Sequence, residues 1–82
     1  MTYKLEVVEW VDSAHSAGWH FIDPRDEPKA TRILSVGWVV VESETVVRLV
    51  PHREIDDDEH EMQVMGDLRI PKTAIISRRV LE

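Results

Sequence analysis

The sequence predicts an all-β protein: a small, strongly bent, five-stranded barrel with a long loop after the first strand. Apolar and polar residues alternate in several short runs, as strands require, and no segment repeats apolar residues at helical spacing. Glycines interrupt two of the expected strands, at Gly37 and Gly66, where they favour sharp bending. The 82 residues suffice for a single domain, residues 1–82, with a modest core.

The first two expected strands are residues 3–11 and 31–42. In the first, the doublet of Val7 and Val8 shifts the alternation of apolar and polar residues, which predicts a bulge. The second is the most apolar part of the chain, so we expect neighbouring structure to cover both of its faces. Gly37 within it predicts a sharp bend or the close approach of another backbone segment.

Residues 12–30 form a long connection between these two strands. Pro24 and Pro28 forbid a regular helix or a central strand there. Residues 19–22 (Trp-His-Phe-Ile) are an apolar island within the connection. A connection this long in so small a domain is often functional. The island is therefore either a binding loop or a plug for one open end of the barrel.

The remaining strands are expected at residues 45–51, 61–70 and 75–81. Gly66 should curve the strand over 61–70, and a single tight turn over 71–73 should precede the last strand. The alternation also predicts which side chains form the core. These are Val36, Trp38, Val40, Leu49, Leu68 and Ile70.

Two segments resemble known protein groups. Residues 66–76, with a proline-led turn between a curved strand and the last strand, resemble the end of SH3-like and Sm-like barrels. Residues 35–40 (Ser-Val-Gly-Trp-Val-Val), followed by a short hairpin, resemble small uncharacterised proteins of bacteriophage and prophage genomes. The resemblance covers roughly residues 31–81 and implies a closed SH3-like or Sm-like barrel and a viral or prophage origin. It implies no catalytic chemistry.

Composition narrows the classes of function. The absence of cysteine excludes disulfides, thiolate nucleophiles and cysteine-ligated zinc. No apolar run has the length of a signal peptide or a membrane span, so we expect a cytoplasmic protein with no membrane partner. Ten basic and sixteen acidic residues give a net charge of −6, which counts against binding nucleic acid.

Two regions supply candidate ligand-binding side chains. Aromatic and imidazole rings in the connection can stack on a planar ligand such as a nucleobase. Residues 69–79 contain four basic residues and no acid, and with Arg32 or Arg48 from a neighbouring strand they can hold a phosphate. The alternative for these cations is solubility and pairing with acidic residues. The candidate set is Trp19, His20, His15, Arg69, Lys72 and Arg78.

Acidic residues and histidines predict neither a metal site nor catalysis. The run over residues 54–61 contains six acids, but it lacks the glycine and the ligand spacing of a calcium loop. It is either a solvated loop or a surface that docks on a basic partner. His15 lies between Ser13 and Ser16, but adjacency in a loop does not make a nucleophile and base. We expect no enzyme activity, no metal and no cofactor.

The expected function is therefore that of a non-enzymatic binding module. Its most concrete form is a phage or prophage accessory protein that binds or sequesters a small anionic ligand, such as a nucleotide signal. A protein of this size also gains stability by forming a homo-oligomer. The alternatives are a protein–protein adaptor or inhibitor that uses the acidic loop 54–61, and a protein that binds single-stranded nucleic acid.

Overall fold

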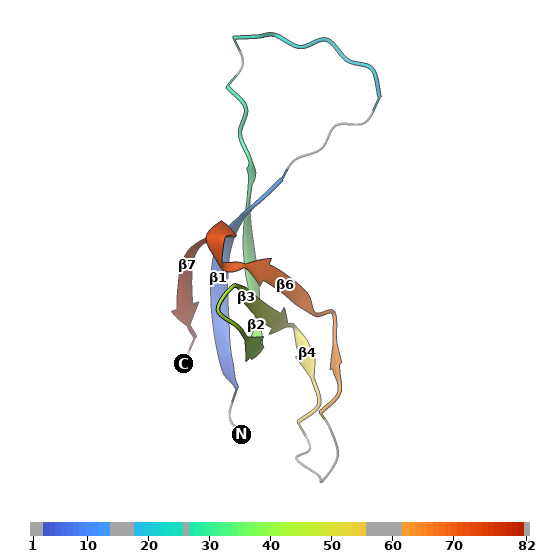
Figure 1. Cartoon of the computed structure of the whole chain (residues 1–82). Coiled ribbons are helices and arrows are strands. Elements are labelled where there is room, and N and C mark those ends of the chain that lie inside the picture. Colours follow the sequence, from blue (N-terminus) through green and yellow to red (C-terminus); the bar gives the residue numbers. More distant parts are fainter. Residues whose placement is uncertain (1–2, 14–17, 26, 56–61, 82) are drawn as a thin grey trace.

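A computed structural model describes residues 3–13, 18–25, 27–55 and 62–81 of the chain. These residues form strands and one short 3₁₀ helix, and contain no α-helix, so the all-β prediction is confirmed (Figure 1). The elements are β1 (Lys4–Asp12), β2 (Thr31–Glu42), β3 (Val46–Val50), β4 (His52–Arg53), β5 (Val64–Met65), β6 (Leu68–Pro71), η1 (Lys72–Ala74) and β7 (Ile75–Val80).

The main sheet has five antiparallel strands in the order β6-β3-β2-β1-β7. Its longest ladder joins β1 to β2, from the Lys4–Val39 pair to the Asp12–Thr31 pair, without a register shift. The two long strands are thus where the alternation predicts them. The expected bulge at the valine doublet is wrong, because β1 shifts register further along, between Glu9 and Trp10, where it pairs with β7.

The expected closed barrel is also wrong, because β6 and β7 remain the two edges of an open sheet. The strand expected over residues 61–70 is split at Gly66, which has a φ of 77°. The first half, β5, leaves the main sheet and pairs with β4 in a separate two-stranded sheet. Only the four residues of β6 remain to extend the main sheet, and β7 has six.

The two edge strands follow each other directly in the chain, joined by η1. The single turn predicted after Pro71 is therefore confirmed. Pro71 has a φ of −60°, which suits the entry to a tight turn. The Lys72 N–H donates to the Thr45 carbonyl oxygen at 2.8 Å, so the turn is fastened to the start of β3. This hydrogen bond links η1 to the start of β3, although the edge strands β6 and β7 do not pair with each other.

The core lies on one face of the main sheet. Val8, Leu49 and Ile70 form its buried centre. Trp10, Val39, Leu68 and Ile75 are partly buried and pack against that centre. Val47 on β3 is also fully buried, and so is Val50, which pairs with Trp38 and lies on the opposite face. Two of the six predicted core residues, Leu49 and Ile70, are buried, and Leu68 packs against them.

The other face of β2 is less covered than the sequence predicts. Val36, an expected core residue, is 49% exposed, and Leu34 is 68% exposed. Trp38 and Val40 are only partly buried. The error has a physical cause: a continuous apolar run indicates that a strand avoids water on both faces, but the described residues of one chain cover only one face well.

Gly37 confirms the prediction of a close backbone approach. A Cβ atom at this position would lie 2.6 Å from the Val50 carbonyl oxygen, well inside van der Waals contact. Because glycine has no Cβ atom, the backbone of β3 at Val50 can lie close to β2 at this point. The molecule as a whole is elongated, with principal extents of 57, 25 and 22 Å.

Candidate functional site

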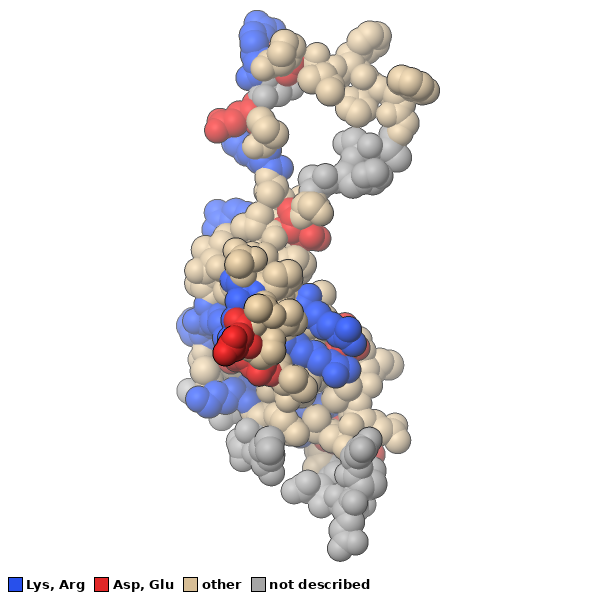
Figure 2. Space-filling view, viewed as in Figure 1, with Lys and Arg blue, Asp and Glu red and all other residues tan. Residues whose placement is uncertain are grey.

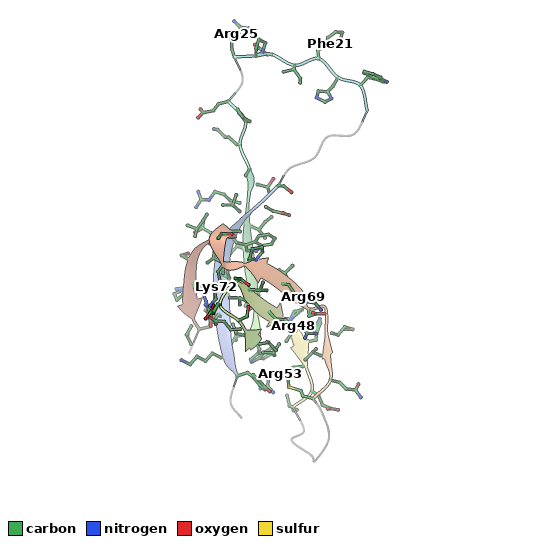
Figure 3. All side chains as sticks on the ribbon, in the orientation of Figure 1. Phe21, Arg25, Arg48, Arg53, Arg69 and Lys72 are labelled. Atoms are coloured by element: carbon green, nitrogen blue, oxygen red, sulfur yellow. The ribbon has the colours of Figure 1, made fainter. Side chains whose placement is uncertain are left out.

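The elongation comes from the connection between β1 and β2. Its described residues, 18–25 and 27–30, lead away from the sheet and are called the arm below (Figure 1). Trp19 and Phe21 on the arm are fully exposed, and Ile22 is 77% exposed. The alternative in which these rings plug a barrel end is wrong, because both rings are fully exposed. Figure 3 shows Phe21 on the arm, away from the body.

The hydrogen bonds of the arm's described side chains are all local. These bonds join residues two apart, from His20 Nδ1 to the Gly18 carbonyl at 3.3 Å and from Arg25 to Asp23. Arg25 Nη2 lies 2.9 Å from Asp23 Oδ2, and both groups are exposed. This pairing lowers the pKa of Asp23 and raises that of Arg25, mainly through their shared side-chain hydrogen bonds. Among the described residues, the arm's side chains thus have no hydrogen-bond partner in the body.

The base of the arm is, by contrast, firmly built. The β1–β2 ladder continues to Asp12 and Thr31, the last residues before the connection. Arg32 is paired with Glu9 across this ladder, and Ser77 Oγ on β7 donates to Glu9 Oε2 at 3.4 Å. Trp10 Nε1 donates to Ser35 Oγ at 3.0 Å. The arm therefore projects from a fixed platform.

Arg78 and Lys72 meet on the body at the carboxylate of Glu42, and Arg78 also pairs with Glu6. Arg78 contacts both oxygens of buried Glu6, at 2.9 and 3.0 Å, and both oxygens of Glu42, at 3.2 and 2.9 Å. Lys72 Nζ lies 2.7 Å from Glu42 Oε2. Glu6 is buried because this guanidinium neutralises it, so a carboxylate occupies a position beside Val8 that the sequence pattern would assign to the surface.

These ion pairs shift the ionisation of the groups involved. Hydrogen bonds from Arg78, and then from Lys72, lower the pKa of Glu42 to about 2. Hydrogen bonds to Glu42 and Glu6 raise the pKa of Arg78. A groove of about 390 Å³ runs beside this cluster, lined in part by Tyr3, Val40 and Arg78. Any anion in the groove would compete with the carboxylates of Glu6 and Glu42, which already pair with these two cations.

Arg69 lies elsewhere, next to Arg48 on the edge formed by β3 and β6 (Figure 3). The two arginines are directly opposite each other in the register of this strand pair. Arg48 Nε lies 2.8 Å from Asp67 Oδ2, and Arg69 Nε lies 3.8 Å from the same oxygen. The Arg69 side chain is 72% exposed, as the sequence predicts.

The six predicted site residues thus fall into separate places. Trp19 and His20 are on the arm, Lys72 and Arg78 share Glu42, and Arg69 is beside Arg48. His15 lies outside the described residues, as do residues 56–61 of the acidic run. Figure 2 shows the same separation by colour: most basic and acidic side chains cover the body, and one side of the arm's far end is uncharged.

Sequence reasoning missed a cationic side chain stacked on aromatic rings. The Arg53 guanidinium lies 5.0 Å from the centre of the Trp38 ring and 5.9 Å from that of Tyr3. Arg53 Nη1 also donates to the Glu54 carbonyl at 3.3 Å. The contact partly covers Trp38 on the face of β2 away from the core. No signal in the sequence identifies this pair, because it depends on where β4 turns after Pro51.

The described part of the chain contains neither a metal-binding cluster nor a membrane-spanning helix. No group of three or more histidine or acidic side chains there is arranged to hold a metal ion. No helix in the same residues has the length and apolarity needed to cross a membrane.

Comparison with known proteins adds no relative to this description. No protein family matches the sequence, and neither a curated protein nor a solved structure gives a match.

Proposed function

We propose that the protein is a non-enzymatic binding module that works as a homo-oligomer, in which the arm of one copy docks on the body of another. The observation that carries this proposal is the large exposed surface. The chain exposes 7060 Å², whereas a compact monomer of this mass exposes roughly 5,000 Å². Its radius of gyration is 16.8 Å, against about 12 Å for a compact domain of this length.

The excess area has the size of a permanent subunit interface. Roughly 2,000 Å² per chain corresponds to about 4,000 Å² for a pair of chains, which lies within the range of obligate homodimers. Single apolar residues on a surface need no explanation. Here, however, Trp19, Phe21 and Ile22 gather on one projecting segment, so their exposure calls for a partner.

A second copy is the partner that best suits the arm, because the same chain carries an uncovered apolar surface. Leu34 and Val36 on β2 are exposed on the face away from the core. Burying aromatic and aliphatic side chains of the arm there would remove apolar area on both copies from water, which is the main favourable term in association. Two copies can exchange arms reciprocally, because a symmetric dimer uses each contact twice.

The finer parts of the sequence-based interpretation remain proposals. The strand order, with β1 between β2 and β7, and a one-turn connection between the edge strands support an opened relative of SH3-like or Sm-like barrels. A phage or prophage origin rests on the resemblance alone. The adaptor alternative depends on an acidic run that is largely outside the described residues.

The proposal is tested by measuring oligomeric state. We expect native mass spectrometry and light scattering to find the wild-type protein as a dimer or larger assembly. Replacing both Trp19 and Phe21 by serine should yield a monomer with an unchanged far-UV circular dichroism spectrum. Lys29→Ser, a polar change on the same arm, is the matched control and should stay assembled.

Three outcomes would contradict the proposal. A wild-type protein that is monomeric at high micromolar concentration removes the second copy as the partner of the arm. A double variant that remains assembled shows that the copies associate through another surface. Retention of a different protein by the wild type, and not by the double variant, would point to a heterologous partner instead.

A further inference from the structure

The pairing of Arg48 with Arg69 is unfavourable unless something negative lies between them. Residues directly opposite in an antiparallel pair have Cβ atoms about 4.5–5.5 Å apart, and like charges in such positions destabilise the sheet. The register of β3 and β6 places these two arginines opposite each other. Within the described residues, one carboxylate, Asp67, accompanies both guanidiniums.

The carboxylate only partly neutralises the pair. Two guanidiniums and one carboxylate leave a net charge of +1, counted as two positive charges minus one. A guanidinium carries five N–H donors in a planar fork. The contacts with Asp67 use Nε of each arginine, and the terminal Nη groups form no hydrogen bond with another described residue. The pair thus retains donors that face solvent.

Oδ2 of Asp67 contacts both arginines, as one oxygen of a bound anion would. Oδ2 is 2.8 Å from Arg48 Nε and 3.8 Å from Arg69 Nε, so a single oxygen bridges the two side chains asymmetrically. A tetrahedral oxyanion has further oxygens that can reach the terminal nitrogens of both forks, and paired contacts of this kind are strong. Asp67 comes directly after Gly66, whose φ of 77° marks the break between β5 and β6.

We propose that Arg48 and Arg69 form a binding site for the phosphate group of a small molecule, and that Asp67 occupies this site as an internal competitor. The site lies on the outer face of the β3–β6 edge, and the side chains of both arginines are accessible, 36% and 72% exposed. Figure 2 shows basic side chains grouped on the part of the body where Figure 3 labels this pair.

A small phosphate compound suits this site better than a nucleic acid does. Proteins that bind nucleic acid neutralise several phosphates along a basic track. The chain as a whole carries a net charge of −6, so a long polyanion is repelled outside this local pair. A single phosphate group can be bound by the two guanidinium groups of Arg48 and Arg69 alone. The proposal does not depend on assembly through the arm, because all three side chains belong to the body of one chain.

The experiment measures the affinity for inorganic phosphate by calorimetry, in a buffer without other oxyanions. The wild-type protein should bind phosphate weakly, and Arg69→Gln should weaken binding about tenfold or more, because a hydrogen bond to a charged group is lost. Arg48→Gln should act in the same direction. Asp67→Asn should strengthen binding several-fold, because it removes the competing charge. This opposite sign separates a site from a merely structural cluster.

The matched control is Arg79→Gln, which removes an equal charge from an exposed position on β7. It should leave the affinity for phosphate almost unchanged. The proposal is wrong if the wild-type protein does not bind phosphate, if Arg79→Gln weakens binding as much as Arg69→Gln, or if Asp67→Asn weakens it. Affinities for a single-stranded oligonucleotide and for adenosine monophosphate are measured as well. If the oligonucleotide binds far more tightly than phosphate and adenosine monophosphate do, the ligand is a nucleic acid and not a small molecule. Circular dichroism of each variant verifies that the sheet is intact.

Discussion

The arm and the body contain similar residues in opposite surroundings. Trp19 on the arm is fully exposed, whereas Trp10 on the body packs against the core and donates a hydrogen bond to Ser35. The ion pair of the arm joins residues two apart, whereas Arg78 on the body joins carboxylates of β1 and β2 to β7. The comparison teaches that residue type alone does not assign a role in this chain. A residue has a structural role here when the fold places another strand against its side chain.

A pair of isoleucines gives the largest expected difference between the two regions. Ile70→Ala in the core should lower the free energy of unfolding by about 2–5 kcal/mol, because Ile70 is fully buried and its loss leaves a cavity. Ile22→Ala on the arm should change it by less than about 0.5 kcal/mol in the monomer. Urea denaturation measures both.

This isoleucine comparison also bears on assembly. Any loss of stability in Ile22→Ala should increase with protein concentration, because only a docked arm can contribute to stability. Equal losses in the two variants, independent of concentration, would mean that the arm packs on its own body.

Two glycines provide a second, smaller contrast. Gly37→Ala should destabilise the body by about 1–3 kcal/mol, because the new methyl group meets the carbonyl oxygen of Val50 and the backbones must separate. Gly18→Ala meets no atom within 4 Å and strains only a φ of 88°. Its local cost in the arm should be about 1 kcal/mol, from the strain of a side chain in the left-handed region.

Thermal unfolding followed by circular dichroism compares these two glycine variants. A Gly37→Ala protein as stable as the wild type would show that β2 and β3 are not as close as described.

Acid should affect the two ion-pair regions differently, and this is the smallest expected effect. The pKa of Glu42 is lowered to about 2 by hydrogen bonds from Arg78 and Lys72. A group whose pKa is lower in the folded state contributes stability above its unfolded pKa and loses that contribution as the pH falls towards the folded value. The side chain is 36% exposed, so we expect a contribution of only about 1 kcal/mol after solvent screening.

The measurement is a set of urea titrations from about pH 6 down to about pH 3. The difference in stability between wild type and Glu42→Gln should shrink as the pH falls. Asp23→Asn on the arm should not change the pH dependence of the body, because the hydrogen bonds of Asp23 to described residues all come from Arg25. A constant difference between wild type and Glu42→Gln would show that Glu42 is not held by its two cations.

The sequence predicts the strands better than it predicts what covers them. Alternation and turn residues locate β1, β2 and η1, and Gly37 correctly predicts a close approach. The pattern also correctly places Arg69 at the surface. It fails at Val36, because alternation indicates which face a side chain occupies and not whether one chain supplies enough atoms to cover that face.

The candidate sites show the same limit. Arg48 and Arg69 are far apart in sequence, and only the register between β3 and β6 makes them neighbours. Closure of the barrel fails for a related reason. Gly66 was expected to bend a strand, but a positive φ followed by Asp67 ends β5 and lets it pair elsewhere. Pairing between distant strands is a property of the whole sheet, which local composition does not determine.

The arm has a consequence for the order in which the sheet assembles. Eighteen residues separate β1 from β2, since β1 ends at Asp12 and β2 begins at Thr31. Closing such a loop costs roughly 1 kcal/mol more in chain entropy than closing a four-residue turn. The connection between β2 and β3, by contrast, spans only residues 43–45. We therefore expect the β2–β3 hairpin to form first, and the long β1–β2 ladder, which positions the arm, to form more slowly.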